Sequence, residues 1–264
     1  MREWIPLAKA EAWAMWRASV LQARETAQVR TALVVSVVQP VVLLVIVSQG
    51  SAPVGSRQTT EMVFGCVMIA LWSATLWGAG TLLRREMAEG TFAALLVRPV
   101  SLLSVLMGKT LGIAALGLIR TVAATAVAVP LLGLRPEVPR ASTAVMVIVS
   151  AVLSAATMGL LLSCAIVLSR AGLRIIEALG YPVFVLGGLL IPPEMLPAVL
   201  RWPAQVVSLR HLSDVVHESA HGRTPGVTPY LAIGLLTAVY LTCGVAALSA
   251  VLRRGRAKGT LELV

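Results

Sequence analysis

Two short stretches of the sequence combine residue types and spacings that could support chemistry. The first reads His-Glu-Ser-Ala-His over residues 217–221. On a helix this spacing places two imidazoles on one face, where they could bind zinc with the glutamate as general base. A catalytic zinc needs a third protein ligand, and the only carboxylate that follows is Glu262, which the topology below places across the membrane. We expect no metal site, and a membrane-embedded zinc metalloprotease using His217, Glu218 and His221 is the alternative hypothesis.

The second stretch is Gly108-Lys109-Thr110, which is similar to the end of a phosphate-binding P-loop. The full pattern has another glycine separated by four residues from the Gly-Lys pair, and Leu103 stands at that position. A strand should also precede the loop, whereas an apolar run surrounds this one. We therefore expect no nucleotide or cofactor on this chain. If ATP drives the protein, ATP and Mg bind to a partner.

The composition predicts an all-α membrane protein. Apolar residues make up 58% of the chain and charged residues 13%, and the mean hydropathy is +0.87. A spanning helix needs about 20 apolar residues. Six apolar runs satisfy or approach this length, and we place them at Thr31–Ser48, Met62–Leu83, Leu111–Leu132, Ser142–Leu168, Ile175–Leu190 and Thr228–Leu252. Gln39-Pro40 in the first run and Tyr181-Pro182 in the fifth predict kinks.

Positive charge predicts the orientation. Fifteen of the 22 Lys and Arg residues lie in segments 1–30, 84–110, 169–174 and 253–264, and six lie in the alternate segments. The positive-inside rule then places both termini and segment 84–110 in the cytoplasm. The net charge of +10 is explained by topology and attraction to lipid. The basic residues form no single stripe, so we expect no nucleic-acid partner.

These assignments divide the chain into three parts. Residues 1–30, with Trp4, Trp13 and Trp16, predict an amphipathic helix on the cytoplasmic leaflet. Residues 31–252 form the transmembrane domain, and residues 253–264 form a basic tail. Cys66, Cys164 and Cys243 fall inside apolar runs at spacings that suit neither zinc nor disulfides.

Two polar segments interrupt the transmembrane domain. Segment 84–98 predicts a short amphipathic helix that Glu86 and Glu89 open and Arg98-Pro99 ends, with Phe92, Leu95 and Leu96 as an apolar face for a soluble partner. The outer segment 191–227 begins with a cluster of prolines, which predicts short or re-entrant helices. We take as candidates for an outer gate Pro192, Pro193, Glu194 and Pro197.

Arg120 lies about 16 Å of helix past Lys109, near the bilayer midplane. Such an arginine normally faces the bundle interior or a cavity. It could bond a Ser or Thr or pair with Glu177, and it could also line a substrate path. The spans otherwise offer Ala, Val, Leu and Gly, so an amphipathic substrate is expected. Further candidates for substrate contacts are Trp72, Trp77 and Phe184.

One block after the second span carries a family resemblance. It reads Glu86-x-x-Glu89-Gly90-Thr91-Phe92-x-x-Leu95-Leu96-x-Arg98-Pro99-Val100-Ser101, and Ile191-Pro192-Pro193-Glu194-Met195-Leu196-Pro197 follows the fifth span. With the six-span layout, the chain resembles the ABC-2 type transporter permeases of bacterial drug exporters. Phe92-Ala93 stand where the family often has Leu-Glu.

The resemblance implies a multi-pass, non-catalytic subunit in a bacterial cell membrane. Segment 84–98 would be the coupling helix that docks on a separate P-loop ATP-binding subunit. Two such subunits and a second permease, identical or homologous, would complete the transporter. The small-residue run from Ser150 to Gly159 permits close helix approach. Efflux of an antibiotic, peptide or lipid is the expected function. Export of a glycan or lipid-linked substrate, and a passive channel or scaffold, are left open.

Overall fold

The structure, a computed structural model, describes residues 4–50, 55–97, 100–137, 141–169, 172–188, 197–221, 223 and 225–258. These residues form helices and connecting loops, with no strand among them. The helices are α1 (Trp4–Gln28), α2 (Arg30–Leu33), the π-helical turn η1 (Val34–Val38), α3 (Gln39–Gly50), α4 (Ser56–Gly78), α5 (Leu82–Ala88), α6 (Thr91–Leu96), α7 (Leu102–Leu131), α8 (Ala141–Leu168), α9 (Leu173–Leu186), α10 (Ala198–Gln205), α11 (Ser208–Ala220) and α12 (Val227–Lys258).

Five of the predicted spans are confirmed as helices with the length and composition to cross a membrane. Within the described residues these are Arg30–Gln49, Ser56–Ala88, Leu102–Leu131, Ser142–Leu168 and Val227–Gly255. The remaining prediction, the fifth run Ile175–Leu190, falls partly on α9. That helix has 14 residues, which give about 21 Å of rise, less than the roughly 30 Å of a bilayer core. A sixth span is therefore not confirmed.

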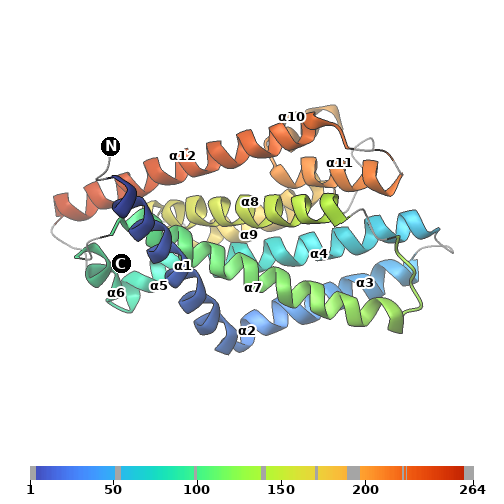
Figure 1. The fold of residues 1–264 in the computed structure, drawn as a ribbon, viewed down its shortest axis with the longest axis horizontal. Coiled ribbons are helices and arrows are strands. Elements are labelled where there is room, and N and C mark those ends of the chain that lie inside the picture. Colours follow the sequence, from blue (N-terminus) through green and yellow to red (C-terminus); the bar gives the residue numbers. More distant parts are fainter. Residues whose placement is uncertain are drawn as a thin grey trace.

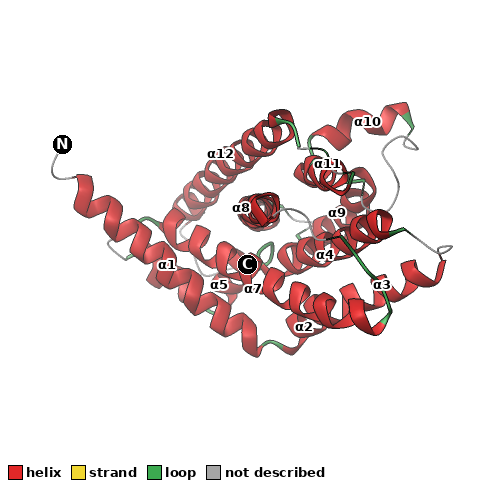
Figure 2. Ribbon diagram, turned by 45° about the vertical axis from the view of Figure 1, so that its right-hand side comes forward, coloured by secondary structure: helices red, strands yellow, loops and turns green. Residues whose placement is uncertain are grey.

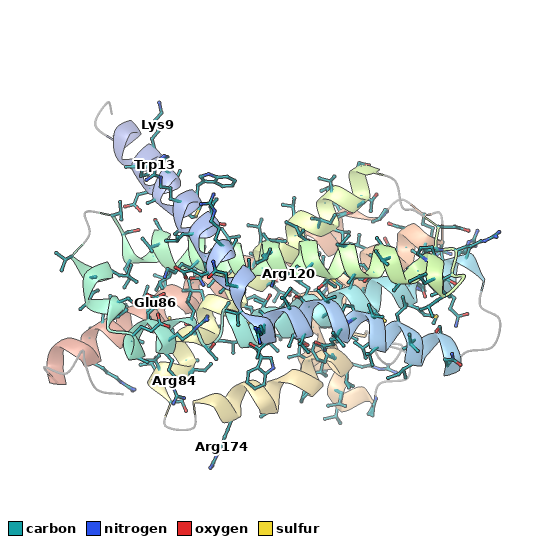
Figure 3. The ribbon with its side chains drawn as sticks, turned by 90° about the horizontal axis from the view of Figure 1, so that it is seen from below. Lys9, Trp13, Arg84, Glu86, Arg120 and Arg174 are labelled. Atoms are coloured by element: carbon teal, nitrogen blue, oxygen red, sulfur yellow. The ribbon has the colours of Figure 1, made fainter. Side chains whose placement is uncertain are left out.

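The long helices lie roughly along one axis, and α1 crosses them obliquely (Figure 1). α8 occupies the centre and packs against α12, α7, α4, α11, α5 and α9 (Figure 2). The start of α1, the pair α5–α6 and the end of α12 gather at one end, which we call the basic end. Lys9, Arg84 and Arg174 lie in the half of the molecule that contains this end and point outward from it, and Arg120 lies farther along the bundle (Figure 3).

The first span contains a π-helical turn where a kink was expected. Pro40 has no N–H, so the carbonyl of Ser36 loses its usual partner four residues later. The Thr121 hydroxyl on α7 donates to that carbonyl over 3.0 Å. The turn Val34–Val38 is the local irregularity that places it there. A neighbouring helix thus satisfies a backbone group that lipid cannot.

α1 packs closely on α7 because two glycines face it. A Cβ on Gly108 would collide with the carbonyl of Met15, and one on Gly112 would collide with the carbonyl of Ser19. These positions are four residues apart and lie on one side of α7, the spacing of a small-xxx-small helix contact. The segment that is similar to a P-loop end therefore lies inside a helix and forms a packing seam.

The small-residue run of the fourth predicted span packs inside this chain. Ala151, Ser154, Ala155 and Ala156 are buried, and a Cβ on Gly159 would meet Ala79 after α4. The run permits close approach, as expected, but between helices of one chain. The small residues of this run are therefore used in contacts within the chain.

The α1–α7 seam can be tested with a single methyl group. Gly112→Ala should lower the thermal stability of the detergent-solubilised protein by several degrees, because overpacking against a backbone carbonyl costs about 1–3 kcal/mol. Gly234→Ala on α12, where nothing lies within 4 Å, should be neutral or stabilising. Equal melting temperatures for the two variants would contradict this packing.

Candidate functional site

The predicted coupling segment consists of two short helices rather than one. Gly90 separates α5 from α6 with a φ of 70°, a left-handed conformation that glycine adopts without steric cost. Arg85 and Glu86 lie on α5, which forms the last part of the span Ser56–Ala88, so the segment begins at the end of that span. Arg98 and Pro99, predicted to end it, lie outside the described residues.

A buried ion pair fixes α5 to α7. The Lys109 ammonium donates to Glu86 Oε1, and both residues are buried, with 9% and 6% of their surfaces exposed. The Thr91 hydroxyl donates to the other carboxylate oxygen, Glu86 Oε2, over 2.6 Å. Both oxygens of this carboxylate therefore have partners, which is the condition under which a buried charge is tolerated. Glu86 holds the segment in place and is not available to a partner.

The predicted apolar docking face is mostly covered by this chain. Phe92 is 1% exposed and shares a cluster with Leu83 and Leu106. Leu95 is 5% exposed and lies in a smaller cluster with Ala18 of α1. Both side chains pack against residues of α1, α5 and α7 within this chain, and their contact with a partner stays a prediction. Leu96 is half-buried.

The surface that remains open around this segment has a different composition. Val97 is 85% exposed. We define the α5–α6 surface by the exposed residues Arg84, Ala88, Glu89, Gly90, Thr91, Ala93, Ala94 and Val97. It presents small and apolar side chains with one acidic and one basic residue, on a support that the Glu86–Lys109 pair holds rigid.

α1 is joined to the same support by a second polar contact. The Glu11 carboxylate accepts hydrogen bonds from the backbone N–H and the hydroxyl of Ser101, both over 2.9 Å. Hydrogen bonds from Ser104 and from Ser101 stabilise the charged form and lower the pKa of Glu11. The predicted N-terminal helix is thus confirmed as a helix, and it belongs to the same unit as α5, α6 and the start of α7.

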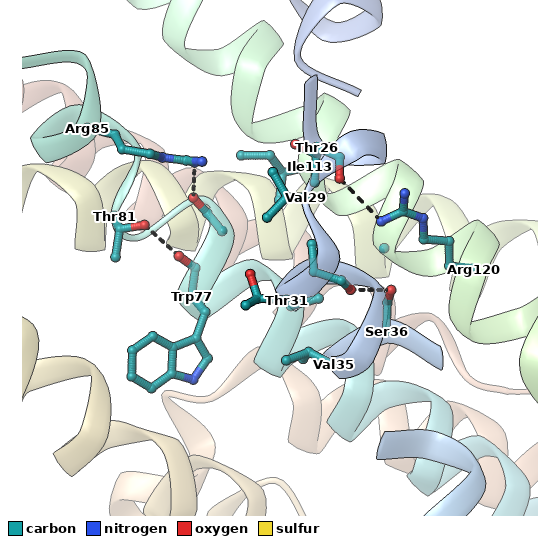
Figure 4. Close-up of a pocket in the computed structure, with 14 residues that line it drawn as sticks. Thr26, Val29, Thr31, Val35, Ser36, Trp77, Thr81, Arg85, Ile113 and Arg120 are labelled. Carbon is teal, nitrogen blue, oxygen red and sulfur yellow. Dashed lines mark hydrogen bonds between the residues drawn. The ribbon is translucent and has the colours of Figure 1, made fainter. Parts of the chain in front are cut away.

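Arg120 binds the end of α1. Its guanidinium donates to the carbonyl of Ala27 over 3.0 Å and to that of Thr26 over 3.5 Å, at the C-terminus of α1. Figure 4 shows the contact with Thr26. The expected partners were a Ser or Thr side chain or Glu177, whose side chain lies outside what the structure describes. A cation at a helix C-terminus is also favourable to the helix dipole.

Arg120 also lines a cavity of about 440 Å³ at the side of the bundle, which we call the side pocket. Arg85 lies on the opposite wall and donates to the carbonyl of Gly78 (Figure 4). The described residues that line the side pocket include these two cations and no carboxylate. Val29, Val35, Trp77 and Ile113 supply apolar wall.

The other predicted substrate contacts separate into two groups. Trp77 lines the side pocket and is 46% exposed. Trp72 and Phe184 are buried in the main core cluster of the bundle, 3% and 7% exposed. The structure brings Trp77 and Arg120 to one cavity and leaves Trp72 and Phe184 in the packing. Arg85 was missed by the sequence analysis, which assigned it only to the polar interruption.

The predicted outer gate is described only in part. Pro192, Pro193 and Glu194 lie outside the described residues, and Pro197 precedes α10. Beyond it, α11 is a short helix with one buried face, and its start is held by Tyr240 of α12 and Ser154 of α8. The Tyr240 hydroxyl donates to the Val206 carbonyl over 2.5 Å, and the hydroxyls of Ser154 and Ser208 lie 2.5 Å apart.

The comparisons with known proteins agree with this arrangement. A model of the family described as ABC-2 type transporter matches residues 10–219. The chain belongs to that family. The match includes α1, the α5–α6 surface and α11, so these elements are parts of an ABC-2 permease and not additions to one. No curated protein matches the sequence.

The buried ion pair should behave as one unit in this permease. Glu86→Gln or Lys109→Met alone should destabilise the protein by about 3–5 kcal/mol, because each leaves an uncompensated buried charge. The double variant should recover much of that loss. Unfolding of the solubilised chain measures both, with the exposed Glu89→Gln as control. Additive losses in the double variant would show that the two side chains act independently.

Proposed function

We propose that this permease is the membrane subunit of an ATP-driven exporter and receives its driving force at the α5–α6 surface. The observation that carries the proposal is the buried Glu86–Lys109 pair, which joins this surface to the long helix α7. A force on α5–α6 is transmitted to α7 through this ion pair, because the pair cannot break without leaving a buried charge unpaired. ATP and Mg act on partner ATP-binding subunits, two per transporter, and this chain is non-catalytic.

The basic end is proposed to face the cytoplasm. Lys9, Arg84 and Arg174 lie in the half of the molecule that contains this end, as α5 and α6 do (Figure 3). The positive-inside rule assigns such an end to the cytoplasmic side, where ATP is available. α10 and α11 then belong to the outer half, as the re-entrant element near an exit gate in a bacterial cell membrane.

A second permease, identical or homologous, completes the conduit. Side chains of α4, α7, α8 and α11 fill the interior of the described bundle in one continuous cluster. Long apolar side chains remain exposed along α7 and α12, among them Ile119, Val127, Leu231 and Leu235. Lipid and a second copy are the environments that suit such surfaces.

The side pocket supports an amphipathic, anionic substrate. Arg85 and Arg120 provide charge from opposite walls, and the apolar wall accepts a hydrocarbon or aromatic body. A glycan would gain less there, because two of the four hydroxyls in the described lining, those of Ser36 and Thr81, already donate to backbone carbonyls of this chain. An antibiotic, peptide or lipid with an acidic group fits this chemistry, and its removal is efflux.

If the α5–α6 surface binds the ATP-binding subunit, substitutions at two exposed valines should have different effects on that binding. Val97→Asp should abolish co-purification of a P-loop ATP-binding subunit from native membranes, because a charge would be desolvated in the interface. Val199→Asp, at an 82% exposed valine on α10, should retain it. Both variants should keep the wild-type melting temperature. Co-purification that survives Val97→Asp would place the docking surface elsewhere.

The two arginines of the side pocket predict that it binds an anionic ligand more tightly than an uncharged one of the same shape. N-lauroylglycine should bind the purified chain about tenfold more tightly than its uncharged amide, one charge-assisted hydrogen bond being worth about 1.4 kcal/mol. Arg85→Gln or Arg120→Gln should remove that preference, and Arg135→Gln, at an exposed arginine outside the pocket, should not. Equal binding of both probes by the wild-type chain, or a preference that survives both pocket variants, would refute the proposed lining.

A further inference from the structure

The two histidines of the His-Glu-x-x-His stretch lie beside a carboxylate from another helix. His217 Nδ1 is 2.7 Å from Glu61 Oε1, and His221 Nδ1 is 3.6 Å from the same oxygen. The two imidazole rings lie 4.3 Å apart between centroids, tilted by 42°. Glu61 belongs to the first turns of α4, and both histidines belong to the last turn and end of α11. The sequence analysis looked for a third metal ligand after His221, whereas the structure places Glu61, which precedes both histidines in the sequence, beside them.

The environment of the Glu61 carboxylate favours a bound cation in this cluster. Its Oε1 is shielded from solvent, yet none of its contacts with described residues has the geometry of a hydrogen bond. A shielded carboxylate oxygen is costly unless a positive charge is near. Its polar neighbours are the two imidazoles, which carry charge only when protonated.

We propose that Glu61, His217 and His221 form a binding site for a divalent transition metal such as Zn²⁺. One ligand atom from each residue lies within 4.8 Å of the others, so small side-chain rotations suffice to bring them around one ion. Two imidazole nitrogens and one carboxylate oxygen are a ligand set that zinc accepts, with a fourth position left to water. Both histidines are partly exposed, which gives an ion access.

The metal would join two elements rather than support hydrolysis. Glu218, the residue expected to act as general base, accepts a hydrogen bond from the backbone N–H of Gly226 over 3.1 Å and so holds the loop before α12. Metal bound to Glu61 and to both histidines cross-links the start of α4 to the end of α11. Buried apolar side chains such as Val215 already pack α11 against α4, and the ion would add a polar link at the exposed end of α11.

The third histidine of the chain provides a matched control. His211 lies on α11 as well, but its Nε2 contacts the carbonyl of Gln205 and it is not part of the cluster. His211→Gln therefore makes the same chemical change on the same helix without touching the site. Glu61→Gln, His217→Gln and His221→Gln each remove one ligand.

The test uses the full chain, purified without a polyhistidine tag, stripped with chelator and titrated with Zn²⁺. Wild type and His211→Gln should bind one ion per chain, and the three site variants should bind at least tenfold more weakly. Zinc should raise the melting temperature of wild type and His211→Gln only. Absence of binding, or equal affinity in all five proteins, would overturn the site. Both readouts are independent of transport, so their failure leaves the proposed function standing.

Discussion

The buried pair between Glu86 and Lys109 is the interaction on which the arrangement of the basic end depends. A carboxylate and an ammonium this well shielded remain charged together only if each keeps its partner, so α5 cannot move relative to α7 without a large free-energy cost. The Thr91 hydroxyl extends the same constraint across the Gly90 turn to the first residue of α6. A two-helix surface too short to be stable alone thereby becomes a rigid extension of a membrane span.

Close packing adds the second constraint. Gly108 and Gly112 lie on either side of Lys109 in sequence and bring α1 against α7. The same few residues of α7 therefore hold α5 electrostatically and α1 sterically. Arg120, further along α7, binds the carbonyls where α1 ends. α7 thus positions the N-terminal helix, the α5–α6 surface and one wall of the side pocket, and a displacement of α7 would change all three together.

Hydropathy was sufficient to predict five membrane helices, because a window of about 20 apolar residues has few other solutions. The run Ile175–Leu190 is not confirmed as a span, because α9 ends at Leu186, before the end of the run. The periodicity of Phe92 and Leu95 correctly indicated an apolar face, but periodicity does not specify which neighbour covers it. Here α1 and α7 cover most of it. Lys109 pairs with Glu86, and Glu61 lies beside His217 and His221. These partners are distant in sequence, so no local pattern predicts them. One signal was readable and was assigned otherwise: Gly108 and Gly112 have the small-xxx-small spacing of a helix contact.

The central claim is that a P-loop ATP-binding subunit docks on the α5–α6 surface. Photo-crosslinking from benzoylphenylalanine at Ala93, an exposed residue of that surface, tests it most directly in native membranes. The account predicts one dominant adduct, whose mass-spectrometric identification yields a chain with a complete phosphate-binding loop. The same probe at Val199 on α10 should give no such adduct. Adducts of Ala93 with lipid or with a second copy of this chain alone would contradict the account.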